Sequence, residues 1–326
     1  MALLTSVSLA QARTLGAALG LEIADVEPLT LGSVNSNFRL RDAAGRPYFG
    51  RLYEEQPRSG AETEVRLLTL LADGGLPVVR PVTNAGGEAV LELEGKPFAI
   101  FPWVAGDWLC LSQVTKAHCF AVGTALAGVH RASPAVGELS RGRFQPQDML
   151  LRLRSVESQC APELQAAIEH VRGKYAQYEP LRVTLPEGVC HGDLFRDNVL
   201  WQGAAISALL DFESAYWGSF AYDLMVTALA WCFTDRLLGT HVRALFEGYE
   251  SVRRLSSLER SALETEGALA CLRFATSRIT DFELRTPAGA RPARDFRRFF
   301  ARLESLEAGH LRRAIEPGRA TQHEDT

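Results

Sequence analysis

The stretch HGDLFRDNVLW, residues 191–201, constrains this chain more than any other part of its sequence. Between apolar flanks it carries five polar side chains: His191, Asp193, Arg196, Asp197 and Asn198. A second stretch, ISALLDFESAYW (206–217), ends an apolar run with Asp211. Polar groups beside strands are costly to bury unless partners compensate them. We therefore expect these two stretches to form a site and not only a packed core.

The order and spacing of three of these side chains predict phosphoryl transfer. Protein kinases use H-R-D-x-x-x-x-N followed by D-F-G. Here Asp193 and Asn198 have that spacing, and Asp211-Phe212-Glu213 stands in the place of D-F-G. Asp193 is predicted to orient an acceptor hydroxyl and take its proton. Asn198 and Asp211 are predicted to bind Mg²⁺, which prefers hard oxygen ligands. The alternative is a polar turn followed by a chance aspartate.

Three neighbouring polar residues are predicted to have structural roles. Asp197 is one position short of the spacing that a metal ligand needs, so it is expected to be solvated or to cap the loop. His191 is expected to hydrogen-bond the backbone of the loop. Asp223, in AYDL, is expected to anchor the same loop, because a buried carboxylate needs donors.

Neither G-x-x-x-x-G-K-[ST] nor G-x-G-x-x-G occurs, so the nucleotide phosphates need another binding device. The stretch LGSVNSNFRL (31–40) is the candidate. It is predicted to place the backbone of a short hairpin over the phosphates. The residues assigned to this role are Gly32, Ser33, Asn35 and Asn37.

Two further segments are predicted to contact the nucleotide. Arg51, in a strand pattern, is expected to offset phosphate charge, with Glu64 on the following helix as its partner; an exposed surface pair is the alternative. The apolar stretch FAIFPWVAG is predicted to bind adenine through the backbone of Phe101, Trp103 and Val104.

The pattern along the chain predicts an α+β, two-lobed fold. An amphipathic helix capped near Ser8 is followed by alternating strand patterns and a helix at 59–75. After Gly106 helical periodicity dominates, including the segments 147–178, 219–233, 237–253, 258–285 and 293–314. The exception is 188–212, which resembles two short strands with a turn at Gln202–Gly203. We predict a nucleotide-binding lobe at 1–104, a small antiparallel sheet with one helix, and a larger, mainly helical catalytic and substrate-binding lobe at 105–326.

Composition restricts partners and compartment. A net charge of −4 and a pI near 6.0 argue against a nucleic-acid-binding surface. The six cysteines show neither C-x-x-C nor zinc-ligand spacing, which favours free thiols in a reducing compartment. The apolar run 224–233 is too short to span a bilayer, which needs about 20 residues. We expect a cytoplasmic monomer or homodimer that binds a small molecule and neither nucleic acid nor membrane. Cys190 beside His191 is a weak candidate nucleophile, because neighbours on a strand face opposite ways.

HGDLFRDNVLW and LLDFESAYWGSFAYDL resemble the aminoglycoside phosphotransferase-like kinases, a branch of the protein-kinase-like fold. Within that group the chain resembles the homoserine kinases. VNSNFRL, RLYEE, HCFAVGTALAGVHRAS, AYDLMVTALAWCF and LRFATSRITDF resemble successive segments of that family across residues 1–310. The resemblance implies ATP and Mg²⁺ as cofactors and homoserine, from threonine biosynthesis, as the acceptor. Glu213 departs from the family, which often has an aromatic residue there.

A homoserine acceptor requires a site for two charges. Its carboxylate suits an arginine fork, and its ammonium suits a carboxylate. The candidates are Arg196, Glu213, Arg278 and Asp281. For Arg278 and Asp281, one helical turn apart, an internal salt bridge is the alternative.

Two other interpretations remain open. The acceptor could be an aminoglycoside, a choline-like alcohol or a sugar; the mixed charge of 147–178 and 258–285 disfavours polycationic aminoglycosides. In the second interpretation, the chain is a protein kinase or a binding module without catalytic activity. A protein kinase needs an activation segment between D-F-G and A-P-E, and the helix expected at 219–233 leaves little room for one.

Overall fold

The computed structural model describes residues 4–30, 34–137, 139–142, 144–284, 286 and 294–316. Contacts divide the chain into two compact units. The first unit comprises residues up to Trp108 together with Asn198–Glu213. The second unit comprises Leu109–Asp197 and the chain from Ser214 onward.

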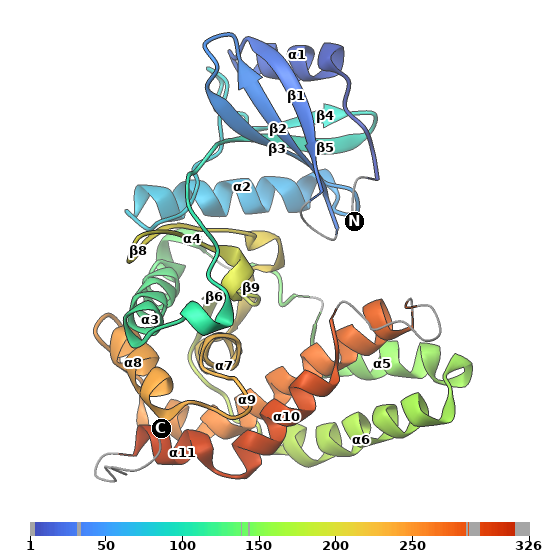
Figure 1. The fold of residues 1–326 in the computed structure, drawn as a ribbon, viewed down its shortest axis with the longest axis vertical. Helices are drawn as coiled ribbons and strands as arrows, with labels where there is room; N and C mark the ends of the chain where they lie inside the picture. The colour runs from blue at the N-terminus through green and yellow to red at the C-terminus, as the bar shows by residue number, and fades with distance from the viewer. Residues whose placement is uncertain are drawn as a thin grey trace. The chain divides into compact units, whose positions relative to one another are not determined.

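The first unit is built on a five-stranded antiparallel sheet in the order β1-β2-β3-β5-β4. Its strands are β1 (Ile23–Leu29), β2 (Ser36–Asp42), β3 (Pro47–Leu52), β4 (Val90–Leu93) and β5 (Lys96–Pro102). Helices α1 (Leu9–Ala18) and α2 (Arg58–Asp73) cover its two faces (Figure 1). The predicted cap of α1 is confirmed, since the Ser8 side chain accepts a hydrogen bond from the Gln11 N–H.

A second antiparallel pair, β7 (Val199–Gln202) and β8 (Ala205–Leu209), also belongs to the first unit. The predicted turn is confirmed at Gly203, which has a φ of 59°. Backbone hydrogen bonds hold the hairpin on both sides, from Leu209 N–H to Pro77 C=O (2.6 Å) and in both directions between Trp201 and Asp107. The hairpin therefore packs with the sheet-containing unit, although its sequence neighbours on both sides are in the helical one.

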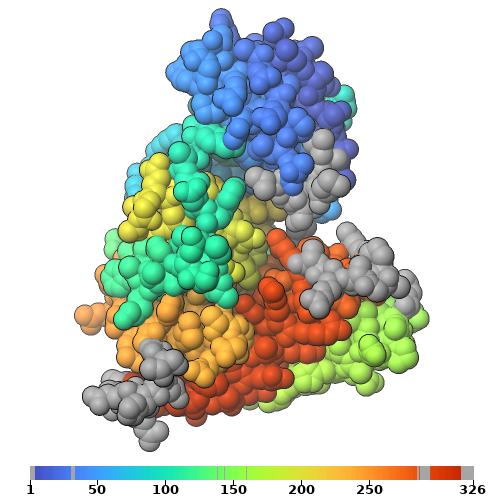
Figure 2. Space-filling model, in the orientation of Figure 1, coloured from blue at the N-terminus to red at the C-terminus, as the bar shows by residue number. Residues whose placement is uncertain are grey.

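The second unit is mainly helical. Its helices are α3 (Lys116–Arg131), α4 (Ser133–Val136), α5 (Pro146–Val156), α6 (Pro162–Tyr178), α7 (Phe220–Trp231), α8 (Gly239–Glu250), α9 (Ser257–Arg278), α10 (Arg297–Glu307) and α11 (His310–Ile315). Helix α9 is central, because α5, α6, α7 and α10 all pack against it. Figure 2 shows one face of this unit, on which α8 (orange), α10 (red) and α6 (green) are exposed. Within the described ranges, no helix is both long and apolar enough to cross a membrane.

The sequence patterns located the helices, and the predicted mixture of an antiparallel sheet with many helices is confirmed. Two predicted helical segments are each divided. Segment 147–178 breaks before Pro162, which begins α6, and segment 293–314 breaks at Gly309, whose φ is 76°. A short antiparallel pair, β6 (Glu187–Cys190) with β9 (Tyr216–Ser219), was not fully anticipated. It brings the residues before His191 beside those after Ser214.

Helices α3 and α8 approach each other closely through two buried glycines. A Cβ on Gly248 would lie 2.0 Å from the Phe120 carbonyl oxygen, and one on Gly123 would lie 2.0 Å from the Leu245 carbonyl oxygen. Both neighbouring atoms are backbone and cannot rotate away. This crossing therefore requires residues without side chains.

We predict that Gly248→Ala lowers the free energy of unfolding by about 1–3 kcal/mol, because the added methyl group must push the helices apart. Urea denaturation followed by circular dichroism measures the change. Gly173→Ala is the matched control. Gly173 is in α6, and a Cβ added there would have no neighbouring atom within 4 Å, so alanine should be neutral or stabilising by up to about 1 kcal/mol. Equal effects of the two substitutions would contradict the prediction.

Candidate active site

The loop that follows β6 is held by one buried carboxylate. Asp223, on α7, accepts hydrogen bonds from the backbone N–H of His191 (2.7 Å) and of Gly192 (2.8 Å). Gly192 has a φ of 75°, a conformation that residues with side chains rarely adopt. The Asp193 N–H donates to His191 Nδ1 at 3.3 Å. The predicted structural roles of Asp223 and His191 are therefore confirmed.

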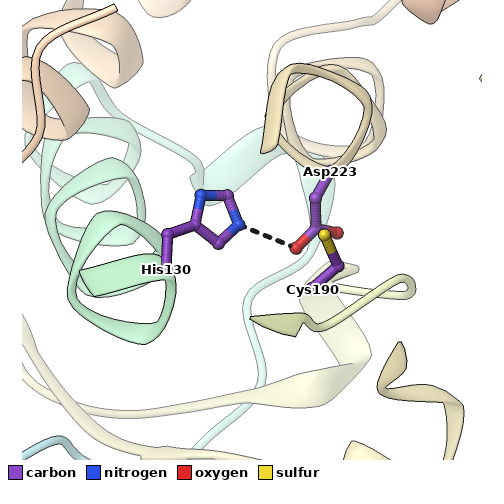
Figure 3. A group of neighbouring side chains, drawn as sticks. All are labelled: His130, Cys190 and Asp223. Atoms are coloured by element: carbon purple, nitrogen blue, oxygen red, sulfur yellow. Dashed lines mark hydrogen bonds and ion pairs between the residues drawn. The ribbon is translucent and has the colours of Figure 1, made fainter. Parts of the chain in front are cut away.

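A chain of hydrogen bonds supports Asp223, and Figure 3 shows its last link, between His130 and Asp223. Arg253 donates to the Tyr249 hydroxyl (3.1 Å), which lies 2.7 Å from His130 Nδ1, and His130 Nε2 lies 3.1 Å from Asp223 Oδ2. Burial lowers the pKa of His130, although Asp223 opposes the shift. Burial alone would raise the pKa of Asp223, but the hydrogen bonds from His130 and from the Gly192 N–H help to outweigh it, and the pKa is lowered. A neutral imidazole that donates to an ionised carboxylate satisfies both groups.

Cys190 lies beside this pair, but its environment excludes the nucleophile hypothesis (Figure 3). The thiol is fully buried and burial raises its pKa well above the ordinary value, so it stays protonated. Its Sγ contacts the Ser219 carbonyl oxygen at 3.5 Å. A packed thiol is the simpler interpretation.

Asp193 faces α9. Its Oδ1 lies 3.7 Å from Nη1 of Arg273, a residue that we did not single out from the sequence. The next two residues contact α7 and α9. The Leu194 carbonyl accepts from Trp231 Nε1 (3.0 Å), and the Phe195 ring packs edge-on against Phe274. The loop is thus clamped between α7 and α9.

The two predicted metal ligands lie at one end of the β7–β8 hairpin. The Leu210 N–H donates to the Asn198 carbonyl at 2.9 Å, directly before Asp211. Asp211 has a φ of 64°, a strained conformation for a residue with a side chain. Such strain is typical of functional positions. The hairpin that we predicted between these residues does bring their backbones together.

Arg51 lies in β3 between two carboxylates. Its Nη1 is 3.1 Å from Glu64 on α2 and 3.4 Å from Asp211. Burial alone would lower the pKa of Arg51, but Glu64 and Asp211 outweigh it and raise the pKa. The alternative of an exposed Arg51–Glu64 surface pair is therefore wrong, because both side chains are mostly buried.

Glu213 belongs to the same cluster. Asn35 Nδ2 donates to its carboxylate at 2.5 Å, and Gln56 donates to its carbonyl at 3.2 Å. Burial raises the pKa of Glu213 to about 7; the Asp211 charge adds to this rise and Arg51 opposes it. Glu213 thus lies with the residues predicted to bind nucleotide, in the first unit.

The other residues predicted to bind nucleotide are also in the first unit. Gly32 and Ser33 lie outside the described residues. Asn37 is buried in β2 opposite Arg51. Phe101 packs near Phe49, with 6.2 Å between ring centroids. Arg39 lies over the Trp103 ring at 4.3 Å, and Val104 is half-buried.

The predicted acceptor residues of the second unit have different environments. A π-helical turn (Ile279–Glu283) shifts the register after Arg278, and Asp281 pairs with Arg152 at 2.5 Å. The alternative of an internal Arg278–Asp281 salt bridge is therefore not observed among the described residues. Arg196 contacts the Leu109 carbonyl at the hydrogen-bond limit of 3.5 Å.

Arg278 is part of a cationic group. Burial, followed by the charges of Arg294, Arg302 and Arg298, lowers the pKa of Arg278 to about 10. Its guanidinium lies 4.7 Å from the Phe299 ring. The Asp193 charge acts in the opposite direction, so this arginine group lies near Asp193. Such a concentration of positive charge favours an anionic ligand.

Comparisons with known proteins identify the family. The model of the phosphotransferase enzyme family matches residues 25–255. Homoserine kinase from Gluconacetobacter diazotrophicus is 36% identical over 79% of this chain and 81% of its own length. Homoserine kinases from Methylorubrum populi and Caulobacter vibrioides are 35% and 34% identical, over 82% and 79% of this chain and 84% and 82% of theirs. The chain therefore belongs to the phosphotransferase enzyme family.

Solved structures agree on the fold. Amicoumacin kinase, in complex with AMP-PNP, Ca²⁺ and amicoumacin, superposes with a TM-score of 0.68 at 17% identity over 95% of each chain. Spectinomycin phosphotransferase, in complex with ADP and spectinomycin, gives 0.65 at 15% identity over 96% of each chain. The kinase-like fold and the phosphotransferase class that we predicted are confirmed.

The buried His130–Asp223 pair generates a prediction about pH. The folded-state pKa of His130 lies below its unfolded value of about 6.5. Below that pH the unfolded chain takes up a proton that the folded chain does not, so the histidine's contribution to stability is lost as the pH falls. His130→Gln retains a donor to Asp223 but cannot titrate. The difference in free energy of unfolding between wild type and this variant should narrow from pH 8 to pH 5.5, by at most about 1.4 kcal/mol per pH unit below 6.5. Urea titrations at both pH values measure it, and a constant difference would contradict the assignment.

Proposed function

We propose that this chain, a member of the phosphotransferase enzyme family, transfers the γ-phosphoryl group of ATP to the hydroxyl of L-homoserine. The observation that carries the proposal is its identity of more than a third to a homoserine kinase over most of both chains. The adenine nucleotides in the fold relatives support ATP as the donor. Cytoplasmic location and a monomeric or homodimeric state stay predictions.

Asp193 is assigned to the acceptor hydroxyl. The hydroxyl oxygen attacks the γ-phosphorus, the bond to the bridging oxygen of ADP breaks, and the hydroxyl proton passes to the Asp193 carboxylate. An aspartate is a weak base at neutral pH, so proton transfer follows the attack and positioning dominates. The two backbone hydrogen bonds to Asp223 support this role, because they fix the residues directly before Asp193.

Asn198 and Asp211 are assigned to Mg²⁺. An amide oxygen and a carboxylate oxygen at one end of a hairpin are the hard donors that this ion prefers, so the residues fit the group. The cluster of the first unit also has more carboxylates (Glu64, Asp211, Glu213) than arginines (Arg51), which favours a cation. When bound, Mg²⁺ would neutralise charge on the phosphates.

Arg51 is assigned to the phosphates, with Glu64 holding its guanidinium in place. Asn35, Asn37, Gly32 and Ser33 are proposed to line the phosphate side, and the backbone of Phe101, Trp103 and Val104 the adenine side. Asn35 also donates a hydrogen bond to the Glu213 carboxylate, so these two side chains are expected to act together.

On the acceptor side, Arg196 and Arg278 are proposed as ligands for anionic groups. Three other arginines reinforce Arg278, so this group suits the multiply charged phosphoryl group in transfer. Glu213 remains the candidate for the ammonium of the acceptor. Asp281 is the weaker candidate, because it already pairs with Arg152.

A different acceptor is the second candidate function. The fold relatives are antibiotic kinases, and an aminoglycoside, a choline-like alcohol or a sugar would use the same catalytic groups. At 15–17% identity these relatives show the fold alone, so homoserine is preferred.

The acceptor is tested by a coupled ADP-release assay with ATP, Mg²⁺ and a panel of hydroxyl compounds. We expect L-homoserine to give a kcat/KM at least about tenfold above that of any aminoglycoside, choline-like alcohol or sugar, because each lacks its particular pair of charges. Phosphorylated homoserine should be detected by ³¹P NMR. Turnover of another acceptor with none of homoserine would reject the substrate and keep the reaction.

The base is tested by Asp193→Ala. We expect kcat to fall by roughly 10²–10⁴-fold or more, with ATP binding retained in a fluorescence titration, because Asp193 is assigned to the hydroxyl and not to the nucleotide. Asp197→Ala is the matched control in the same loop. Its side chain is two-thirds exposed and pairs weakly with Arg294 (3.6 Å), so activity should be retained. Near-native activity of Asp193→Ala would show that the roles are wrongly assigned.

A further inference from the structure

The second unit contains a cavity next to the catalytic loop. It has a volume of ≈ 90 Å³, and its wall includes Gly192, which directly precedes Asp193. Pockets for drug-sized ligands typically measure about 300–1,000 Å³. This cavity is therefore suited to a molecule of a few heavy atoms.

Arg273 contributes a buried positive charge to the wall of this cavity. It is 7% exposed, and its guanidinium lies over two aromatic rings, 4.1 Å from that of Phe144 and 3.8 Å from that of Phe274. Stacking of this kind fixes the plane of the guanidinium fork. A rigid fork recognises a carboxylate through two parallel hydrogen bonds.

The charge of Arg273 is incompletely compensated. The other described arginines of the wall, Arg182 and Arg141, make short ion pairs with Glu266 and Glu187. Arg273 has no side-chain hydrogen bond to any described residue, and the carboxylate nearest to it, that of Asp193, is 3.7 Å away. A buried cation without close acceptors is costly, unless a ligand completes its shell.

Three tyrosines also line the cavity. Burial raises the pKa of Tyr175, Tyr216 and Tyr222, and the charge of Arg273 opposes the rise at each, so all three lie near its guanidinium. The Tyr216 ring is tightly enclosed, since a Cβ on Gly218 would lie 2.2 Å from its Cε2 atom. The wall of the cavity therefore supplies aromatic rings and neutral hydroxyl groups.

We infer that Arg273 is the specificity-determining residue that binds the carboxylate of the acceptor, with its hydroxyl directed to Asp193. This inference rests on the proposed function and names the chemical class of the acceptor, a small hydroxy compound with a carboxylate. The 3.7 Å between Arg273 and Asp193 suits such a molecule, whose carboxylate and hydroxyl are separated by only a few bonds. Both ends can then form hydrogen bonds of about 2.7–3.0 Å.

Arg278 was the candidate from the sequence, and its environment differs. It lies among three other arginines, which suits a phosphoryl group, whereas Arg273 has one singly charged neighbour and an adjoining small cavity. A single carboxylate is the better match for Arg273. The two assignments give different kinetics, so one experiment separates them.

The experiment compares Arg273→Gln, Arg278→Gln and wild type on two acceptors, L-homoserine and 3-aminopropan-1-ol, which is homoserine without its carboxylate. For Arg273→Gln we expect KM for homoserine to rise by roughly 30- to 1,000-fold, with KM for ATP unchanged, because a charge-assisted pair is lost. The kcat/KM for 3-aminopropan-1-ol, already low in wild type, should change less than threefold. Arg273→Lys should be intermediate, since it keeps the charge and loses the fork.

Arg172→Gln serves as the matched control, because Arg172 is on α6 and pairs with Glu157 away from the cavity wall. It should leave both acceptors unaffected, and thermal melting checks that all variants fold. If Arg273→Gln does not fold, calorimetric titration of L-homoserine into Arg273→Lys and into wild type measures the loss of affinity directly.

The outcomes separate the two proposals. If Arg273→Gln impairs both acceptors equally, Arg273 acts only through Asp193 and the inference is overturned. If Arg278→Gln alone raises KM for homoserine, the sequence assignment holds and the inference is overturned. A third outcome is that wild type does not phosphorylate homoserine but phosphorylates another hydroxy acid. If Arg273→Gln then raises the KM for that hydroxy acid, the inference stands and the proposed function is rejected.

Discussion

The pairing of Asp223 with the backbone of His191 and Gly192 is the interaction on which the catalytic loop depends. A carboxylate buried without partners would destabilise the fold by several kcal/mol. Here the N–H groups of His191 and Gly192, together with His130, compensate it. A movement of the loop would break the two backbone hydrogen bonds and leave the buried carboxylate without those partners. The chain of donors continues through Tyr249 to Arg253, which itself pairs with Glu259 at 2.8 Å. Residues of α3, α7, α8 and the start of α9 therefore determine where Asp193 lies.

The two units carry opposite electrostatic characters. The first unit places Glu64, Asp211 and Glu213 around one arginine; burial raises the pKa of Glu213, and the neighbouring carboxylates add to the rise. The second unit gathers arginines near Asp193; burial lowers the pKa of Arg278, and the neighbouring arginines lower it further. An excess of carboxylates suits a metal ion, and an excess of arginines suits phosphate and carboxylate groups. Each unit thus lacks the counter-charges that the proposed substrates would bring.

Much of the fold and the loop could be predicted from the sequence, because their signals are local. The Asp193–Asn198 spacing, the Ser8 cap and the helical periodicities each occupy one short segment. Arg273 could not be found in this way. Its cavity is assembled from residues near 144, 175, 192, 216 and 273, and no local pattern reports that they meet. The environment of Asp281 was also not predictable, since a single π-helical turn changes the register that an α-helical spacing assumes, and Asp281 pairs with Arg152.

The position of the β7–β8 hairpin has a consequence for how the chain folds during synthesis. The first unit is interrupted after Trp108 and is completed only by Asn198–Glu213. When the ribosome has made residues 1–108, the backbone groups of Pro77 and Asp107 still lack their partners in the hairpin. About a hundred more residues must emerge before the hairpin is complete and can dock. Such long-range pairing slows folding and leaves backbone edges exposed meanwhile. The backbone groups of Pro77 and Asp107 therefore stay without these partners during that interval, and a fragment ending near residue 108 would lack part of its own structure.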